Sequence, residues 1–401
     1  MKEIVLLFDM DNVLLTPGGY RMAIRDSMKY HLNEGKVSDR IPLESLPEIF
    51  ESVGVTNEWD MMAITLSILC DKVLEKQTQP IELQSVEECA KWLAKQPLEG
   101  VQVDYREEVL KIVNYASPGE PVAFSLYRAA RKEENNHLFS FLKQHETLLK
   151  NILACTPDVY QSSLTRVFQN LILGSERFEA AYGLPAEVQT GSYLEIYDHT
   201  NLSEDWLHWI LAKHKSGFLR PVLFTARPSL PPNGAIISDR HFSPEAEAGA
   251  RVVNLELLPL VGMGRADYIA SINGKNMEEL LKPNAFHAAA SIFRAFIKDE
   301  MAALDAAYRL CFEKKLEKID GLNMADIEVH VFEDSPGGVR AAREAVQILK
   351  NAGLSIDLFI WGIADHKDKI ASLEKLGGIV SEEINCALGK FQQRLEIYGN
   401  D

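Results

Sequence analysis

Two carboxylates stand one residue apart directly after a short apolar run near the N-terminus. The run covers residues 4–8, and Asp9 and Asp11 follow it. Such a run predicts a strand that is buried on both faces, as in a parallel sheet. Asp9 would then lie at the carboxyl end of the strand, where open α/β sheets bind their ligands. An isolated Asp-x-Asp also occurs in surface turns and as the metal-binding pair of sugar transferases, so the motif alone leaves these alternatives open.

Polar side chains also end two later runs that read as strands, at residues 222–224 and 327–332. The polar residues that end them are Thr225, Glu333 and Asp334. The carboxyl ends of parallel strands lie along one edge of a sheet, so we expect these side chains to converge with Asp9. Lys282 stands between the two runs, directly before a proline and a predicted helix.

The elements that must position these residues come in two blocks. Residues 1–14 and 203–401 alternate strand and helix patterns, which predicts an α/β domain with a doubly wound parallel sheet. Residues 15–202 show almost only helical spacing, so we predict an all-α domain inserted after the first strand. Within these blocks, residues 192–197 could form a short strand. Residues 228–250 are rich in Pro, Gly and Ser, which indicates a long loop.

The composition excludes several classes of protein. The 401 residues are 46% hydrophobic and 25% charged, as in an ordinary soluble globular protein. The formal net charge of -16 argues against a nucleic-acid partner, which needs a concentrated basic surface. The five cysteines show no Cys-x-x-Cys spacing, so neither a zinc site nor a disulfide framework is indicated. With no apolar segment of membrane-spanning length and no signal peptide, we expect a cytoplasmic protein without a membrane partner.

The order of the polar groups along the chain resembles the haloacid dehalogenase superfamily, in which a carboxylate pair, a hydroxyl, a lysine and an acidic pair follow one another. The most specific segment is FEDSPGGVRAA at residues 332–342, which is similar to the phosphatase and β-phosphoglucomutase-like branch. The predicted helical insert has the position of that branch's mobile cap, although it is much longer. The resemblance implies a Rossmann-like core with a cap, Mg²⁺ as the cofactor and a small phosphorylated metabolite as the substrate.

The resemblance also implies a role for each residue. Asp9 would attack phosphorus and become an aspartyl-phosphate, while Asp11 would protonate the leaving oxygen and later deprotonate water. Thr225 would donate a hydrogen bond to a phosphoryl oxygen, and Lys282 would supply a fixed positive charge. Arg227 is a further candidate for a phosphate or substrate contact. The expected Mg²⁺ ligands are Asp9, the backbone carbonyl of Asp11, Glu333 and Asp334.

Two residues decide how far the resemblance extends. Asp11 favours phosphoryl transfer over dehalogenation, because displacing a halide needs no proton donor. Asn12 stands where the family usually has glycine, and Asn tolerates left-handed backbone geometry better than most residues. We therefore expect a Mg²⁺-dependent phosphohydrolase. The alternatives are a phosphomutase or phosphotransferase of the same fold, and a non-catalytic binding module that uses the enlarged cap.

Overall fold

The computed structural model describes residues 2–32, 37–98, 100–117, 120–156, 158–236, 242–316 and 326–398. The chain forms two compact units. Unit 1 comprises Met1–Pro17 and Tyr197–Asp401, and unit 2 comprises Gly18–Ile196.

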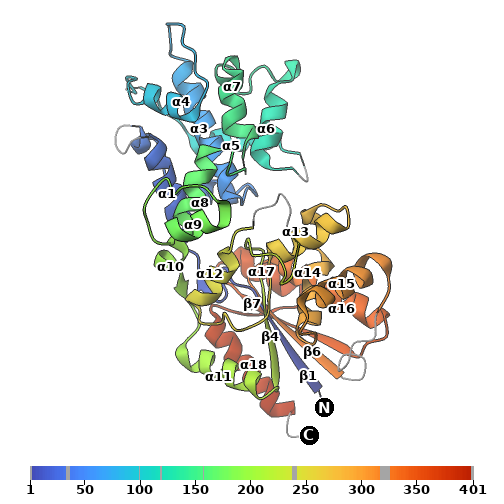
Figure 1. Ribbon diagram of the computed structural model, residues 1–401. Helices are drawn as coiled ribbons and strands as arrows, with labels where there is room; N and C mark the ends of the chain where they lie inside the picture. The colour runs from blue at the N-terminus through green and yellow to red at the C-terminus, as the bar shows by residue number, and fades with distance from the viewer. Residues whose placement is uncertain are drawn as a thin grey trace. The chain divides into compact units, whose positions relative to one another are not determined.

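Unit 1 is built on a six-stranded parallel sheet with the order β5-β4-β1-β6-β7-β8. Its strands are β1 (Lys2–Phe8), β4 (Leu219–Phe224), β5 (Leu260–Val261), β6 (Asp326–Glu333), β7 (Ile356–Ile363) and β8 (Ile379–Ser381). The first strand lies inside the sheet, and the chain winds outward from it in both directions (Figure 1). The predicted α/β fold, a doubly wound parallel sheet with a helical insertion, is confirmed. Such sheets bind ligands where the winding reverses, which here is beside β1.

Helices cover both faces of this sheet, because successive side chains of a strand point to opposite faces. Val5 and Leu7 face a cluster that includes α13 (Met263–Ile272), α14 (Ala285–Arg294), α15 (Glu300–Tyr308) and α16 (Pro336–Asn351). Ile4 and Leu6 face a cluster that includes α11 (Glu204–Lys215), α12 (Glu245–Val252) and α18 (Ile384–Tyr398). The remaining elements are α17 (Lys367–Lys375), a 3-10 turn η5 (Met277–Glu279) and a π turn η6 (Arg309–Glu313).

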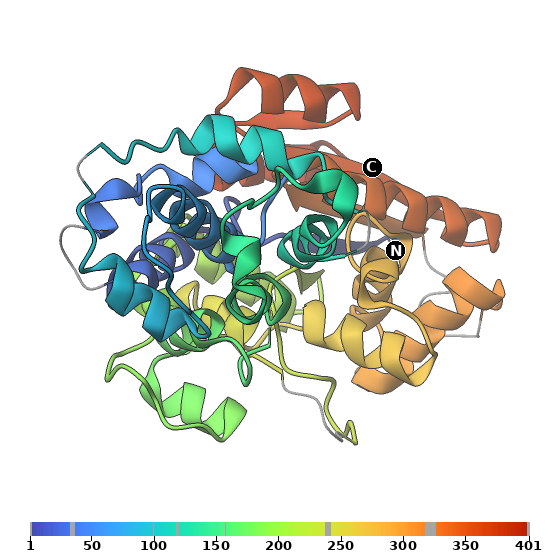
Figure 2. The ribbon, with the colours of Figure 1, turned by 90° about the horizontal axis from the view of Figure 1, so that it is seen from above.

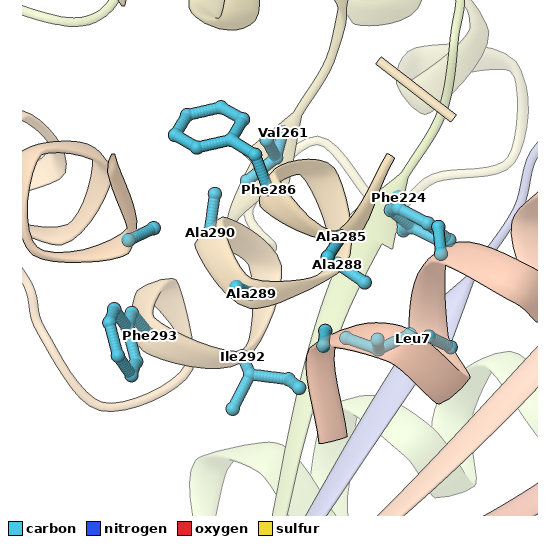
Figure 3. Packing of buried hydrophobic residues seen from close by; sticks show 14 of the residues in the cluster. Leu7, Phe224, Val261, Ala285, Phe286, Ala288, Ala289, Ala290, Ile292 and Phe293 are labelled. Carbon is cyan, nitrogen blue, oxygen red and sulfur yellow. The ribbon is translucent and has the colours of Figure 1, made fainter. Parts of the chain in front are cut away.

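Helix α14 packs closely against β1, β4 and β5. Its buried residues include a run of alanines, whose small side chains allow the helix to approach the strands. Figure 3 shows Ala285, Ala288 and Ile292 of this helix on the side of Phe224 and Leu7. The start of α14 is thereby held near the ends of β1 and β4.

A two-stranded ribbon marks the place where the chain leaves unit 1 and returns to it. Strands β2 (Leu15–Thr16) and β3 (His199–Thr200) pair antiparallel. The N–H of Asn201 donates to the carbonyl of Leu14 at 2.8 Å, and Thr16 Oγ1 donates to Asn201 Oδ1 at 2.8 Å. Because of this pairing, residues 15–17 and 197–202 belong to unit 1, whereas the sequence analysis placed them in the helical domain.

Unit 2 is helical, and its helices are coloured blue to green in Figure 2. They are α1 (Gly19–Leu32), α2 (Leu46–Glu51), α3 (Glu58–Leu74), α4 (Val86–Leu93), α5 (Tyr105–Val113), α6 (Val122–Ala130), α7 (Glu146–Leu149), α8 (Ser163–Leu173), α9 (Ser175–Tyr182) and α10 (Tyr193–Tyr197). Short turns η1 (Ser38–Arg40), η2 (Glu133–Asn135), η3 (Leu142–Gln144) and η4 (Lys150–Ala154) join them. Helix α3 is buried along most of its length and contacts α1, α2, α4, α5, α6 and α8, so it forms the centre of unit 2.

Two local predictions were wrong. Residues 192–197, predicted as a short strand, contain helix α10, whose first turn is capped because Ser192 Oγ accepts from the Glu195 N–H at 3.4 Å. Residues 228–250, predicted as a loop, end in helix α12, while residues 237–241 lie outside the described part of the chain. The first segment is too short to show helical periodicity. The second is rich in helix-breaking Pro and Gly residues, which hide the periodicity of α12. Within the described residues, no helix combines the length and the apolar character that a membrane span requires.

Candidate active site

The sheet register brings the ends of three strands to one level. Phe8 pairs with Leu223 of β4 and with Phe332 of β6. The Asp9 N–H donates to the carbonyl of Phe332 at 3.0 Å, so the ladder continues one residue past β1. The polar residues that follow these strands therefore lie at a common edge of the sheet.

Three buried carboxylates gather at this edge. Each of them offers an oxygen that lies within 4.8 Å of an oxygen of the others, and the residues are Asp9, Glu333 and Asp334. Only 8%, 0% and 7% of these residues, respectively, is exposed. The convergence expected from the strand ends is thus present for these three acids. The carboxylate of Asp11 lies outside this group and contacts Arg227 instead.

Lys282 reaches the acidic group from the loop before α14. Its ammonium lies 2.9 Å from Asp9 Oδ1 and 3.0 Å from Glu333 Oε2. The same ammonium sits 4.0 Å from the centroid of the Phe224 ring, where a cation–π contact adds to the two ion pairs. Lys282 is therefore the lysine that faces the predicted nucleophile.

A neutral histidine orients the backbone at Lys282. Burial lowers the pKa of His287 to about 3, so its ring carries one proton at neutral pH. Nδ1 accepts a hydrogen bond from the Lys282 N–H at 3.3 Å, and Nε2 lies 3.0 Å from the carbonyl of Val261, to which it donates. Asn284 caps α14 by accepting from the Phe286 N–H at 3.1 Å. The first turn of α14 thus fixes the direction of the lysine.

The charges at this edge are not balanced by Lys282 alone. Burial raises the pKa of Asp9 well above its usual value, and the negative charge of Glu333 raises it further. Burial likewise raises the pKa of Glu333. Burial by itself would lower the pKa of Lys282, but the carboxylates of Asp9 and Glu333 outweigh it and raise that pKa. Additional positive charge would stabilise the acidic group, and its all-oxygen donor set fits a hard divalent cation such as Mg²⁺.

Asp334 has two partners, Asn12 and Lys369, and neither contact was expected from the sequence. Asn12 Nδ2 donates to Asp334 Oδ2 at 3.1 Å, and the Lys369 ammonium in the first turn of α17 also binds Oδ2. Asn12 has φ of 58°, the left-handed region that its residue type tolerates. Lys369 follows the carboxyl end of β7, the next strand after β6, and this place after a strand end is the sequence signal that points to it.

Glu333 is held by the tight start of α16. Ser335 Oγ accepts from the Gly338 N–H at 3.2 Å, which caps the helix, and the same hydroxyl donates to Glu333 Oε1. Pro336 occupies the first helical position. A Cβ at Gly338 would lie 2.2 Å from the carboxyl carbon of Glu333, so only glycine lets the helix approach this acid.

Thr225 and Arg227 follow β4. The Thr225 residue is 1% exposed, and its Oγ1 accepts from the Arg227 N–H at 3.1 Å. The Thr225 hydroxyl therefore keeps its own proton for donation to another group. The Arg227 side chain is 2% exposed, and its guanidinium pairs with the carboxylates of Asp11 and Asp198. Both ion partners of this guanidinium are thus carboxylates of unit 1, and the phosphate or substrate contact expected from the sequence stays a prediction.

The comparisons with known proteins concern the fold. No family model and no curated protein matches the chain. The crystal structure of Northeast Structural Genomics Consortium target ZR25 is similar over 99% of this chain and 100% of that chain, with 17% sequence identity and a TM-score of 0.61. A crystal structure of a Thermotoga maritima protein provisionally named beta-phosphoglucomutase is matched over 98% of this chain and 99% of that chain, with 16% identity and a TM-score of 0.36. The first similarity concerns the fold alone, and the second is too weak to support an argument.

Proposed function

We propose that this chain is a Mg²⁺-dependent phosphohydrolase of the haloacid dehalogenase type that acts on a small phosphorylated metabolite. The observation that carries the proposal is the convergence of Asp9, Glu333 and Asp334 on one edge of the sheet with Lys282 bound to two of them. A buried carboxylate that faces a lysine and two further acids is a poor structural element but a suitable nucleophile beside a metal.

The first requirement of the reaction is that two anions approach each other. Two unit charges at about 4 Å repel by roughly 4 kcal/mol at an effective dielectric of 20. Mg²⁺ held by Asp9, Glu333, Asp334 and the backbone carbonyl of Asp11 would neutralise and orient the phosphate. Lys282 would add a fixed charge beside the nucleophile, because its ammonium already binds Asp9 Oδ1.

The residues of the chain would then share the two chemical steps. A carboxylate oxygen of Asp9 attacks phosphorus, and a bond between phosphorus and Asp9 forms as the bond to the leaving oxygen breaks. Asp11 gives its proton to the leaving oxygen and then takes one from the water that hydrolyses the aspartyl-phosphate. The Thr225 hydroxyl donates a hydrogen bond to a phosphoryl oxygen, because its oxygen already accepts a hydrogen bond from the Arg227 N–H.

A panel of small phosphate esters tests the proposal. We expect the purified chain to release inorganic phosphate in the presence of Mg²⁺ and to stop when EDTA removes the metal. Folded protein that turns over no ester in a broad panel would contradict the proposal.

Isotope-labelled water separates hydrolysis from transfer to a second substrate. If water is the acceptor, ¹⁸O from the solvent enters the released phosphate once per turnover. Transfer of the phosphoryl group to another hydroxyl, with no label from water, would assign the chain to the phosphomutase alternative instead.

A further inference from the structure

A buried arginine binds the carboxylate of Asp11 through two of its nitrogen atoms. Arg227 Nε donates to both Asp11 oxygens at 3.0 Å, and Nη2 donates to Oδ1 at 2.6 Å. The same Nη2 donates to Asp198 Oδ2 at 2.9 Å. The Asp11 side chain is 34% exposed, whereas the side chains of Arg227 and Asp198 are 2% and 0% exposed. One end of this triad therefore faces solvent and the other end is completely buried.

The triad joins three segments that are otherwise far apart in the chain. Asp11 lies just before β2, Asp198 lies just before β3, and Arg227 follows β4. The pairing of β2 with β3 holds the first two segments together. The backbone of Arg227 is fixed as well, because its carbonyl accepts from the Met263 N–H at 3.0 Å.

Helix α12 packs closely against the guanidinium of Arg227. A Cβ at Gly249 of α12 would lie 2.9 Å from Arg227 Nη1 and 2.5 Å from the terminal methyl carbon of Met10. The helix therefore contacts the arginine at the one position where a side chain is missing. A guanidinium confined in this way presents a preorganised fork to Asp11.

Asp198 has a specific electrostatic role in this arrangement. An uncompensated buried charge is strongly unfavourable, so the guanidinium of Arg227 needs a carboxylate partner that stays in place. The side chain of Asp11 is 34% exposed and is the partner that can turn toward a substrate, whereas the side chain of Asp198 is completely buried beside Arg227. Asp11 can then exchange hydrogen bonds with a leaving oxygen while Arg227 remains in place.

We infer that Asp198 and Arg227 are positioning residues that orient Asp11 for proton transfer, with Asp198 acting through Arg227. The inference rests on the proposed function, in which Asp11 is the general acid. Asp198 lies in no predicted motif, and its side chain is fully buried. The inference predicts that its loss lowers kcat/KM most for esters whose leaving oxygen must be protonated.

The test is the leaving-group dependence of kcat/KM, which reports only the steps up to formation of the aspartyl-phosphate. Wild type and Asp198→Asn are compared on a series of aryl and alkyl phosphate monoesters. For an aryl ester with a good leaving group, such as 4-nitrophenyl phosphate, we expect the variant to stay within about threefold of wild type. For an alkyl ester we expect a loss of about 10- to 100-fold, because protonation of the leaving oxygen is then required.

A matched control separates positioning from general damage. Glu300 is also a buried carboxylate of unit 1, and it binds Arg265 Nε at 3.1 Å and accepts from the Asn233 N–H at 2.9 Å. Glu300→Gln should change kcat/KM by the same factor for every ester. If Asp198→Asn behaves like this control, Asp198 has only a structural role and the inference is overturned.

A double variant tests whether Asp198 acts through Asp11. In the Asp11→Asn background, Asp198→Asn should add no further leaving-group dependence, because the group it orients is gone. An additional loss on alkyl esters in that background would contradict the inference. If Asp198→Asn does not fold, Arg227→Lys keeps the charge but loses the bidentate fork, and the same contrast between esters is expected. A wild type that turns over none of the esters would refute the proposed function itself, which is a separate result.

Discussion

The helical unit and the α/β unit both bury carboxylates, but the oxygens of these carboxylates meet different groups. In unit 2, Asp60 accepts from the N–H groups of Val122 and Ala123 at 2.9 and 3.2 Å. Asp71 of the same helix accepts from two further backbone N–H groups, at 2.9 and 2.8 Å. In unit 1, Asp9 and Glu333 face each other and share the ammonium of Lys282.

The difference shows that burial alone does not identify a reactive acid. Burial raises the pKa of Asp60 and Asp71 just as it raises the pKa of Asp9. In unit 2, however, the backbone N–H groups act in the opposite direction and satisfy the carboxylates. In unit 1 the nearest groups of Asp9 include other acids, so its charge is only partly compensated. The partners of the oxygens, and not the degree of burial, separate a structural acid from a candidate catalytic one.

The largest effect is expected for Asp9→Asn. Turnover should fall at least a thousandfold, about 4 kcal/mol in the activation barrier, because the attacking oxygen is lost. The thermal midpoint of the metal-free variant should equal or exceed that of wild type, since a poorly compensated buried charge is removed. Activity and thermal unfolding measured on the same preparation check both expectations. A variant that is inactive because it is unfolded would leave the comparison between the units without support.

The second prediction concerns metal binding. Mg²⁺ at about 100 times its dissociation constant should stabilise the protein by about 2.7 kcal/mol, and Asp334→Asn should abolish most of this gain. Because the pKa values of Asp9 and Glu333 are raised, their folded-state contribution is favourable at low pH and is lost as the pH rises through the raised values. The stabilisation by Mg²⁺ should therefore grow with pH over the same window. Denaturant unfolding with Mg²⁺ or with EDTA, followed from acidic to neutral pH, checks this; a metal effect independent of pH would contradict it.

The third prediction addresses the helical unit. Asp60→Ala leaves the backbone N–H groups of Val122 and Ala123 without their acceptor and should lower the free energy of unfolding by about 2 kcal/mol. Asp71→Ala should behave in the same way, because its partners are of the same kind. Urea titration gives the stability, and the chemical step, measured as turnover per folded molecule with saturating substrate, should be unchanged. A specific loss of that turnover in either variant would place catalytic chemistry in unit 2.

The smallest effect is expected for Glu328→Gln, an acid of β6 that lies before the strand end. His330 Nε2 lies 3.4 Å from one of its oxygens and Lys2 Nζ lies 2.7 Å from the other. The contact with His330, followed by the hydrogen bond from Lys2, lowers the pKa of Glu328 to about 2. A lowered folded-state pKa stabilises the protein above the unfolded value and loses this contribution as the pH falls toward 2. We therefore expect a loss of about 1 kcal/mol at pH 7 that disappears near pH 2, with normal turnover; a stability difference that persists at pH 2 would show that the effect is not electrostatic.

The acidic group could be predicted because it depends on where apolar runs stop. Buried strands of a parallel sheet end at one edge, so Asp9, Glu333 and Asp334 follow from the pattern once the strands are recognised. Lys282 was singled out because a Lys-Pro pair precedes a helix, and the structure brings its ammonium to Asp9. The roles of these residues in a reaction remain predictions.

The contacts of Asp11 and Asp334 with their partners could not be predicted, because they depend on short irregular segments and on tertiary packing. Asp198 lies between a five-residue helix and a two-residue strand, where neither a helical nor a strand pattern can develop. Lys369 looks like any surface lysine in the first turn of an amphipathic helix. The sequence predicts Arg227 as a phosphate or substrate contact. Its contact with Asp11 depends on the packing of α12 against the arginine, which the sequence pattern does not reveal.

The ribbon of β2 and β3 suggests where the inserted helical unit could be removed from unit 1 by protein engineering. Leu15 stands opposite Thr200 and Thr16 opposite His199, so the two ends of the inserted unit leave the core side by side. A tight hairpin turn of about two residues could join the same two adjacent strand ends directly. A chain shortened in this way would retain every acid and lysine of the sheet edge. Different inserted domains could then be joined to the same core at these two strands.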